Sequence, residues 1–375
     1  MVFEEFGKLI SRICSRSPLA AGRPLAWAII ANPRAGGFTI RSRWKKHHAQ
    51  LLECAKRAEK NPLREGGPFH IAHGAAVLKD KPGFTGLILT ETVGHAEKIT
   101  QALIEDISRT NIPEDDKRPF YLIITAGGDG TSREVLTSLF HAPAEIRKNC
   151  VVLRLPMGTG NDGCDARELD KALDLLIEPS TLAQQRALRL RTSSGKGPFL
   201  AFNILSVGLD AFVTHMTNKT KGKLPGDSYK LWVDIAALFY DLVYKVGYME
   251  VRATDSEGKE VKAFREKLLL LAVGESGRRT YGSNKKILPD DRNICAVKQM
   301  SLFRKLALKG LLPYGTHADK PEVMLWNAVA VEFSAQYPLL AQMDGETVLL
   351  EQGDFPAVIE LTEPVIPVLK KPPGK

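Results

Sequence analysis

The sequence predicts an α/β fold followed by a domain built mostly of β-strands, and three observations lead to this expectation. Apolar strand candidates alternate with helical patterns four times in the first half of the chain, which is typical of βαβ units around a parallel sheet. Two of these candidates, residues 121–126 and 151–155, end in glycine-rich turns, as buried parallel strands do where they pass into helices. After Glu178 strand candidates follow one another with few helices between them, which indicates an antiparallel sandwich. We therefore expect a doubly wound parallel-sheet domain and a β-rich sandwich domain.

Length and composition allow two packed cores. The chain has 375 residues, of which 44% are hydrophobic, and such a length is enough for two domains. We expect a helical extension over residues 1–23, an α/β domain over 24–182 and a β-sandwich over 183–350. The closing segment, residues 351–375, is expected to return to the N-terminal domain and to end in a disordered tail.

The N-terminal segment has a helical pattern of apolar residues. Phe3, Phe6, Ile10 and Ile13 recur at helical spacing, with basic residues on the other faces. Such a helix either packs on its own domain, which we favour, or lies on a membrane surface.

The positive charge of the chain restricts its partners. The formal net charge of +9 is spread over short clusters such as residues 41–46 and 219–223. No recognised nucleic-acid module or interleaved aromatic residues accompany these clusters, so we expect no nucleic-acid partner. Anionic lipid headgroups or phosphorylated ligands would account for the same charge.

Cysteine usage and hydropathy bear on the compartment. The five cysteines form no Cys-x-x-Cys pair, which is typical of buried thiols in a reducing compartment. No window approaches the roughly 18 apolar residues of a membrane span, and no signal-peptide pattern is present. We expect a cytoplasmic protein.

Four predicted strands should present their following turns at one edge of the sheet. Residues 25–31 lead into a turn at 32–36, and residues 86–89 lead into a turn at 90–96. Ligands of open α/β sheets bind at the carboxyl ends of the strands. Together with the two glycine turns, these segments predict a crevice whose expected occupant is an oligophosphate.

The first glycine turn suits a phosphate group. Gly127, Gly128 and Gly130 leave room for close backbone approach, and the next helix supplies amides backed by its dipole. Asp129 would repel phosphate, so an acid here suggests a Mg²⁺ ligand, a hydroxyl-positioning group or an orienter of amides. An ordinary turn with Asp129 as helix N-cap is the simpler alternative.

The second glycine turn, residues 158–163, formally matches the dinucleotide fingerprint Gly-x-Gly-x-x-Gly. The fingerprint should open the first βαβ unit and be followed by an acid at the end of the next strand. Here the next candidate strand, residues 186–191, ends in arginine, and Pro156 precedes the turn. We therefore exclude a dinucleotide unit, and the absence of a Walker A pattern excludes an ordinary P-loop.

Further candidates lie outside the glycine turns. Arg34 and Arg133 could contact phosphate. Asp344 and Glu346 flank a glycine in a tight turn, and an acid near a phosphate site could deprotonate an acceptor hydroxyl or hold a metal. An Asp-Gly hairpin turn is the alternative interpretation of the same residues.

Five motifs occur in a specific order. They are Asn-Pro-x-x-Gly at residues 32–36, Thr-x-x-x-Gly-His-Ala at 90–96, Gly-Gly-Asp-Gly-Thr at 127–131, Pro-Met-Gly-Thr-Gly-Asn-Asp at 156–162 and Asp-Gly-Glu at 344–346. In this order they resemble the diacylglycerol kinase catalytic family, which includes bacterial lipid kinases and sphingosine and ceramide kinases. NAD kinases are distant relatives. The resemblance implies an α/β nucleotide domain, a β-rich lipid-binding domain and an active site in the interdomain cleft.

The resemblance also implies roles for individual residues. Glu346 would be the general base on the lipid hydroxyl, with Asp344 in the same catalytic motif and Asp129 at the phosphates or at Mg²⁺. The implied ATP contacts are Asn32, Pro33, Arg34, Ala35, Gly36, Thr90, Gly127, Gly128, Asp129, Gly130, Thr131, Ser132, Arg133, Gly158, Thr159, Asn161 and Asp162.

Two departures from the family pattern affect the second domain and the acceptor. Bacterial relatives have a Pro-x-Ala-x-x-x-Asp-Gly stretch in which an Asp helps to hold a structural Mg²⁺. Here residues 288–295 are shorter and have Arg292 where the acid belongs, so either Asp290 or Asp291 replaces it or this metal site is missing. Arg133 stands where relatives often have Asn, which leaves the acceptor open.

We expect an ATP- and Mg²⁺-dependent kinase that phosphorylates a hydroxyl of a diacylglycerol-like or sphingoid lipid, at the inner face of the membrane and peripheral to it. A kinase of a soluble acceptor such as a polyol or NAD, and a nucleotide-binding regulatory protein without turnover, are the alternatives. The oligomeric state is open, with a homodimer as one option.

Overall fold

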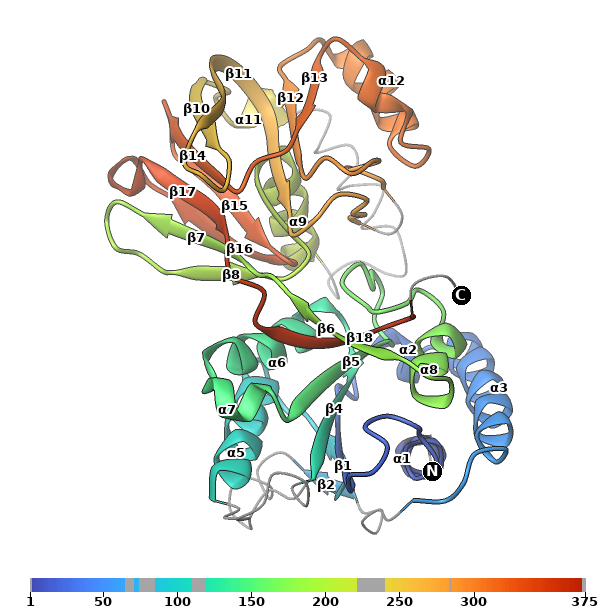
Figure 1. The fold of residues 1–375 in the computed structure, drawn as a ribbon. Coiled ribbons are helices and arrows are strands. Elements are labelled where there is room, and N and C mark those ends of the chain that lie inside the picture. The colour runs from blue at the N-terminus through green and yellow to red at the C-terminus, as the bar shows by residue number, and fades with distance from the viewer. Residues whose placement is uncertain are drawn as a thin grey trace. The chain divides into compact units, whose positions relative to one another are not determined.

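The computed structural model describes residues 2–64, 71–73, 85–109, 119–220, 240–282 and 285–372. Two compact units divide the chain (Figure 1). Unit 1 comprises residues 1–185 together with 364–375, and unit 2 comprises residues 186–363.

Unit 1 is built around a seven-stranded sheet. Its strands are β1 (Leu25–Ala31), β2 (Ile71–His73), β3 (Thr85–Leu89), β4 (Phe120–Gly127), β5 (Cys150–Pro156), β6 (Thr181–Gln185) and β18 (Ile366–Lys370). Their order in the sheet is β2-β3-β1-β4-β5-β18-β6. The five strands from β2 to β5 are parallel, and every residue of β4 and β5 is buried, as expected for strands covered on both faces.

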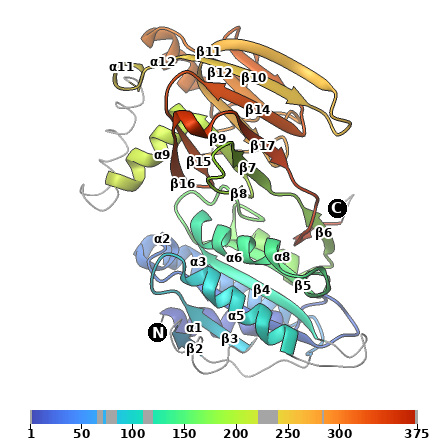
Figure 2. The same cartoon turned by 90° about the vertical axis from the view of Figure 1, so that its left-hand side faces the viewer.

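Helices cover both faces of this sheet. They are α1 (Val2–Cys14), α2 (Gly36–Thr39), α3 (Arg41–Ala58), α5 (His95–Arg109), α6 (Asp129–His141), α7 (Ala144–Arg147) and α8 (Leu169–Ile177). In Figure 1 the helices α1, α3 and α8 lie on one side of the sheet and α5, α6 and α7 on the other, and Figure 2 shows α5 and α6 in front of the strands. The predicted doubly wound α/β fold is confirmed.

One edge of the sheet is not parallel. The C-terminal strand β18 pairs with β5 in parallel at Val368 and Val152, and β6 pairs with β18 in the antiparallel direction. The sheet is therefore mixed rather than wholly parallel. The prediction missed β6 because its short, largely exposed sequence lacks a continuous apolar run.

Helix α1 is part of the core of unit 1. Phe6, Ile10 and Ile13 have no exposed surface. The ring of Phe6 meets the ring of Phe38 in an edge-on contact with 5.0 Å between centroids. Because Phe38 lies in α2, the N-terminal helix supports the turn that follows β1. No described helix has the length and apolar character needed to cross a membrane.

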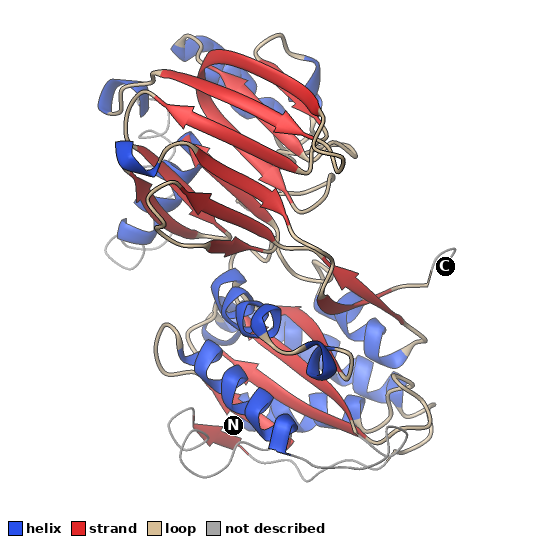
Figure 3. Cartoon of the chain, turned by 60° about the vertical axis from the view of Figure 1, so that its left-hand side comes forward, coloured by secondary structure: helices blue, strands red, loops and turns tan. Residues whose placement is uncertain are grey.

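Unit 2 consists mainly of antiparallel strands (Figure 3). The strands are β7 (Leu188–Thr192), β8 (Phe199–Ala201), β9 (Ile204–Gly208), β10 (Tyr248–Thr254), β11 (Glu260–Gly274), β12 (Ile294–Lys298), β13 (Val323–Trp326), β14 (Ala330–Ala335), β15 (Leu339–Met343), β16 (Glu346–Leu350) and β17 (Ala357–Leu361). The helical elements are α9 (Leu209–Thr220), α11 (Tyr240–Val243), α12 (Leu302–Leu311), η2 (Thr316–Asp319) and η3 (Gln352–Asp354). The predicted antiparallel, β-rich second domain is confirmed.

One long strand joins the two parts of the unit 2 sheet. The sequence predicts separate strands at residues 261–264 and 267–273, whereas the structure has the single strand β11. The charged residues Arg265 and Glu266 lie between the two predicted strands, but they form cross-strand ion pairs with Glu250 and Lys298. The strand then continues into a stretch that is buried on both faces.

The packing of α1 leads to a stability prediction. Replacing Phe6 with Ala removes a fully buried ring and should lower the free energy of unfolding by about 3–5 kcal/mol, measured by urea denaturation. The matched control is Lys8→Ala on the exposed side of the same helix, where the solvent-screened ion pair with Glu4 should contribute little. Equal effects of the two changes would contradict a core role for α1.

Candidate functional site

The register of the parallel strands brings four turns to one edge of the unit 1 sheet. Ala31 at the end of β1 pairs with Leu89 of β3 on one side and with Ala126 of β4 on the other. Gly127 of β4 pairs with Pro156 of β5. The turns after these strands therefore begin in one row, where the chain order changes direction and a ligand crevice is expected.

The turn after β1 is bonded to both of the other glycine turns. The Asn32 side-chain oxygen accepts a hydrogen bond from the Arg34 amide at 2.9 Å, and the Asn32 amide donates to Ala126 at 3.0 Å. The Gly37 amide donates to the carbonyl of Met157 at 2.8 Å. The predicted ATP contacts at residues 32–36 therefore lie beside those at 127–131 and 156–162.

The two glycine turns approach so closely that Gly158 cannot be replaced by a larger residue without a clash. A Cβ atom on Gly158 would lie 2.5 Å from the Cα of Gly128. The Asn161 side chain holds the second turn, because its oxygen accepts from the Gly158 amide at 2.7 Å and its nitrogen donates to the Pro156 carbonyl at 3.2 Å. Asn161 has a φ of +58°, a conformation that asparagine tolerates better than most residues.

Asp129 joins the two glycine turns. It is the first residue of α6, and Gly128 is the N-cap. One carboxylate oxygen accepts from the Gly163 amide at 3.0 Å, and the other would lie 3.0 Å from a Cβ on Gly160. The simpler alternative, Asp129 as helix N-cap, is wrong. Burial raises the pKa of the nearby Cys164 thiol well above its ordinary value, and the Asp129 charge acts in the same direction.

The start of α6 presents amides without a side-chain cap. Gly128 offers no capping side chain, so the first-turn amides are available to an anion. Thr131 packs on Gly127, and Ser132 shares a 2.9 Å hydrogen bond with Thr125 of β4. The buried Nε of Arg133 has no hydrogen-bond partner among the described residues.

The first amides of the neighbouring helix α5 are capped by a side chain, because the Glu134 carboxylate lies at the N-terminus of α5. The Glu134 carboxylate accepts from the amides of Gly94 and Ala96 at 2.9 and 3.0 Å. Thr90 is buried at the end of β3, and its amide donates to Ala31 at 2.9 Å. An anion therefore finds open helix amides at α6 and a carboxylate at α5. Sequence reasoning missed Glu134, because it looks like a surface helix residue.

A buried ion pair fixes the far end of the second glycine turn. Arg154 in β5 donates to Asp165 through its backbone amide at 2.7 Å and through its Nε at 3.1 Å, and both side chains are buried. Arg154 also donates to Gln185 at 3.0 Å. The loop that contains Asp162 is thus tied to the strand that precedes it. An arginine in an otherwise apolar strand was the sequence signal for this pair.

Arg43 is a further cation beside the turn after β1 that the sequence prediction missed. A Cβ on Gly36 would lie 3.0 Å from a terminal nitrogen of Arg43 and 3.7 Å from the Thr159 hydroxyl. Arg43 is half-buried and has no ion-pair partner among the described residues. Its membership of the basic cluster at residues 41–46 was visible, but only the fold turns this member toward the glycine turns.

In unit 2 the predicted catalytic acids lie in the turn between β15 and β16. Asp344 and Gly345 have φ values of +48° and +100°, and Met343 pairs directly with Glu346. The Asp344 carboxylate accepts from the amides of Phe202, Asn203 and Ile204, the last two at 3.1 and 3.0 Å. Glu346 is exposed and makes no hydrogen bond or ion pair within the described part of the chain. Asp344 thus holds the turn, and Glu346 is available for chemistry.

Polar residues behind this turn connect it to α9. The Gly345 amide donates to Gln342 at 3.1 Å, and Asn218 of α9 donates to the Gly345 carbonyl at 2.8 Å. Gln342 also donates to Ser206 at 2.9 Å, and the Ser206 hydroxyl donates to Asp210 at 2.6 Å. The position of Glu346 is therefore fixed by side chains of β9, α9 and β15.

The two predicted metal ligands are both paired with arginines. Asp290 accepts from Arg292 at 3.0 Å and Asp291 from Arg278 at 2.7 Å, and these arginines lower the pKa of each carboxyl. Among the described residues, no group of three or more His, Cys, Asp or Glu side chains could hold a metal ion. The residues present therefore do not fit a structural Mg²⁺ site at 288–295.

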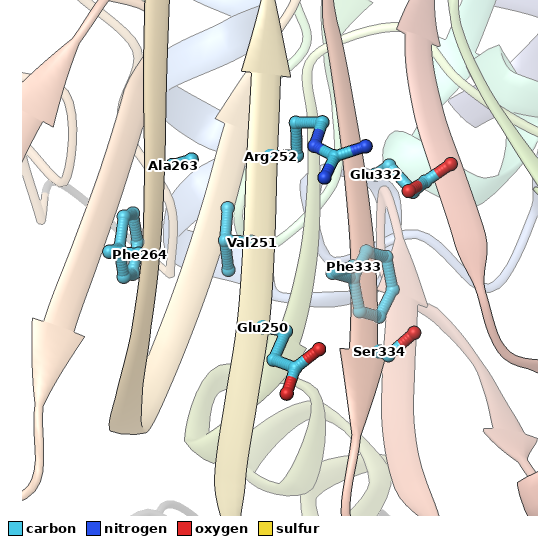
Figure 4. Close-up of a pocket in the computed structure, with 8 residues that line it drawn as sticks. All are labelled: Glu250, Val251, Arg252, Ala263, Phe264, Glu332, Phe333 and Ser334. Atoms are coloured by element: carbon cyan, nitrogen blue, oxygen red, sulfur yellow. The ribbon is translucent and has the colours of Figure 1, made fainter.

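A hollow on the outer face of unit 2 is separate from these residues. It is lined by side chains of β10, β11 and β14, among them Glu250, Arg252 and Glu332 (Figure 4). Glu250 pairs with Arg265, and Arg252 pairs with Glu260. The charges of these two lining residues are therefore balanced by neighbouring side chains. We assign no function to this hollow.

The contact between the glycine turns can be tested by substitution. Gly158→Ala should lower the free energy of unfolding by about 1–3 kcal/mol, because the new methyl group overlaps the backbone at Gly128. The control is Gly353→Ala, where a Cβ meets nothing within 4 Å. Thermal unfolding measures both variants, and a Gly158→Ala protein as stable as the control would contradict the described contact.

Comparison with known proteins supports the motif assignment. Residues 26–192 match the diacylglycerol kinase catalytic domain model. The chain is 26% identical over 284 residues to a diacylglycerol kinase of Staphylococcus carnosus, covering 72% of this chain and 81% of the relative. It is 23% identical over 230 residues to a "Probable lipid kinase YegS-like" of Enterobacter sp. strain 638, covering 60% and 71%.

The fold also matches a solved structure. A candidate diacylglycerol kinase from Bacillus anthracis strain Sterne superimposes with a TM-score of 0.56 over 92% of this chain and 95% of that chain. At 17% identity this likeness concerns the fold alone. Residues 26–192 are thus similar in sequence to the diacylglycerol kinase catalytic domain, and the likeness in fold extends over 92% of the chain.

Proposed function

We propose that this chain is an ATP-dependent lipid kinase that transfers the γ-phosphate of ATP to a hydroxyl of a diacylglycerol-like or sphingoid lipid. The observation that carries the proposal is the cluster of three backbone turns around the open start of α6, with Asp129 spanning two of them. Such a cluster of amides and glycines suits a chain of phosphates.

Unit 1 would bind the nucleotide. The amides at residues 128–131 would donate to phosphate oxygens, and Thr159 would add a hydroxyl. Arg43 and Arg133 would supply positive charge, because each has a guanidinium nitrogen without a partner among the described residues. Phosphoryl transfer depends mainly on positioning and on balancing charge at the phosphates, and these groups are suited to both tasks.

Mg²⁺ would enter with ATP. Asp129 is the described carboxylate closest to both glycine turns, and only one of its oxygens has an assigned amide partner. Asp129 would hold the metal, which would offset the negative charge of the phosphates.

Unit 2 would supply the base for the acceptor. Glu346 is exposed at the start of β16, with its backbone fixed by the hairpin and by α9. A carboxylate in this state can accept the proton of a hydroxyl as the oxygen attacks phosphorus. Asp344 would act as a positioning residue, because its oxygens are taken by three backbone amides.

The lipid acceptor is supported by the relatives, two of which are named as a diacylglycerol kinase and a lipid kinase. A lipid acceptor resides in a bilayer, so the proposal requires the protein to reach a membrane surface. A soluble acceptor such as a polyol or NAD, and binding without turnover, are the outcomes that the next experiment separates from it.

The acceptor class can be identified by labelling. Purified protein is incubated with γ-labelled ATP and Mg²⁺, once with a total lipid extract and once with a pool of soluble metabolites. We expect label in the organic phase of the lipid reaction. Label only in the aqueous products would assign a soluble acceptor, and label in neither would favour a nucleotide-binding protein without turnover.

The different roles of the two acids in the β15–β16 turn give a paired prediction. Glu346→Gln should lower turnover by about 10²–10⁴-fold, because the amide cannot accept the proton, with stability and ATP binding unchanged. Asp344→Ala should instead lower the free energy of unfolding by about 2 kcal/mol or more, since three amides lose their acceptor. Unchanged turnover in Glu346→Gln would remove this residue as the base.

Arg43 can be tested against a neighbour on the same helix. Arg43→Gln should raise the KM for ATP by about tenfold or more while leaving the fold intact, because one charge-assisted contact to phosphate is lost. Arg41→Gln is the matched control, since Arg41 is exposed at the start of α3. Equal KM values in the two variants would show that Arg43 does not contact the nucleotide.

A further inference from the structure

Helix α12 in unit 2 departs from the usual amphipathic arrangement, although its Leu308 packs on a core cluster of the unit. Its Lys305 is 7% exposed and forms an ion pair with Asp241 of α11. Phe303 is 83% exposed and Leu306 is 47% exposed. A helix that covers a protein core normally turns its apolar side chains inward and its charges outward.

The outward apolar side chains form a continuous stripe. Phe303, Leu306, Ala307 and Gly310 follow at i, i+3, i+4 and i+7, and all are exposed. Tyr314, 75% exposed, continues the stripe beyond the helix. Of the thirteen large apolar side chains that are exposed in the described part of the chain, four lie within residues 302–314. Single exposed apolar residues are ordinary, whereas a cluster of this kind marks a contact surface.

The buried Lys305 shows that apolar packing does not by itself determine which side of α12 faces the unit. Burying an ammonium group is unfavourable unless a partner offsets its lost hydration, and Asp241 provides that partner. The ion pair fixes which side of α12 faces the unit, and the apolar stripe must then face outward. Figure 1 shows α12 at the periphery of unit 2, next to the edge strand β13.

The charge around the stripe is positive. No acidic residue occurs between Gln299 and Asp319. Lys309 lies in the last turn of α12. Exposed Lys286 lies beside the following turn, where its amide donates to Leu312 at 2.9 Å. Arg304 pairs with Glu322 at 2.7 Å, so the exposed Lys286 provides the surplus.

We propose that the outer face of α12, defined by Leu302, Phe303, Leu306 and Tyr314 with Lys286 at its margin, docks on an anionic lipid bilayer. Aromatic and aliphatic side chains would enter the interfacial region while Lys286 contacts headgroups. The N-terminal helix does not provide such a surface, because its apolar side chains are buried in unit 1. The choice of a bilayer as partner rests on the proposed function, because that function has a lipid acceptor. The exposed apolar surface is observed independently of the proposed function.

Vesicle binding without ATP tests this surface separately from catalysis. The full-length protein is sedimented with phosphatidylcholine vesicles that contain or lack phosphatidylglycerol. We expect binding to the anionic vesicles, weakened by high salt, and little binding to the neutral ones. The double variant Phe303→Glu, Leu306→Glu should bind anionic vesicles at least about tenfold more weakly. Lys286→Gln should reduce binding about fivefold.

Val261→Glu is the matched control, because Val261 is an exposed apolar residue on β11 in the same unit. It should bind as the unaltered chain does, and all variants should keep the original unfolding temperature. Undiminished vesicle binding by the double variant would overturn the proposal. A second outcome would also overturn it. If the unaltered chain self-associates, and the double variant is monomeric but binds vesicles as before, the stripe joins two copies of the chain. Lack of lipid phosphorylation in the labelling experiment would not alter this result.

Discussion

The close contact between the turns after β4 and β5 is the constraint on which the nucleotide side of the molecule depends. A Cβ on Gly158 would overlap the backbone at Gly128, and Asp129 reaches across from one turn to the Gly163 amide of the other. Because the Gly37 amide donates to the Met157 carbonyl, the turn after β1 is held in the same cluster. The result is a surface made mostly of backbone amides, which suits an anion that approaches the chain closely.

The elements that could be predicted are those whose information is local. Apolar runs followed by glycines identified β4 and β5 and the turns after them, because chain geometry alone requires small residues there. The residues that were missed act through distant partners. Glu134 caps α5 from another helix, Asp165 pairs back onto β5, and Arg43 lies beside Gly36 only because α3 follows α2 at that angle. No spacing in the sequence shows such pairings.

The acids of residues 288–295 illustrate a different case, in which a family pattern suggests a metal ligand and the fold brings arginines to the same carboxylates. Asp290 and Asp291 were the nearest replacements for a metal ligand, yet each faces an arginine that the family pattern does not include. An arginine that already neutralises a carboxylate leaves a cation little to gain there. The arginine at position 292, noted as a departure, was therefore the more informative residue.

The turn at residues 344–346 shows that a structural and a functional interpretation need not compete. A two-residue hairpin loop favours positive φ at both positions, and Asp344 and Gly345 meet this requirement. The same geometry directs the Asp344 carboxylate to three amides of the neighbouring strand region and starts β16 at Glu346. The Asp344 carboxylate accepts from three amides, whereas the Glu346 carboxylate has no partner among the described residues. A tight hairpin is thus the means by which the chain separates a structural acid from a reactive one only two residues away.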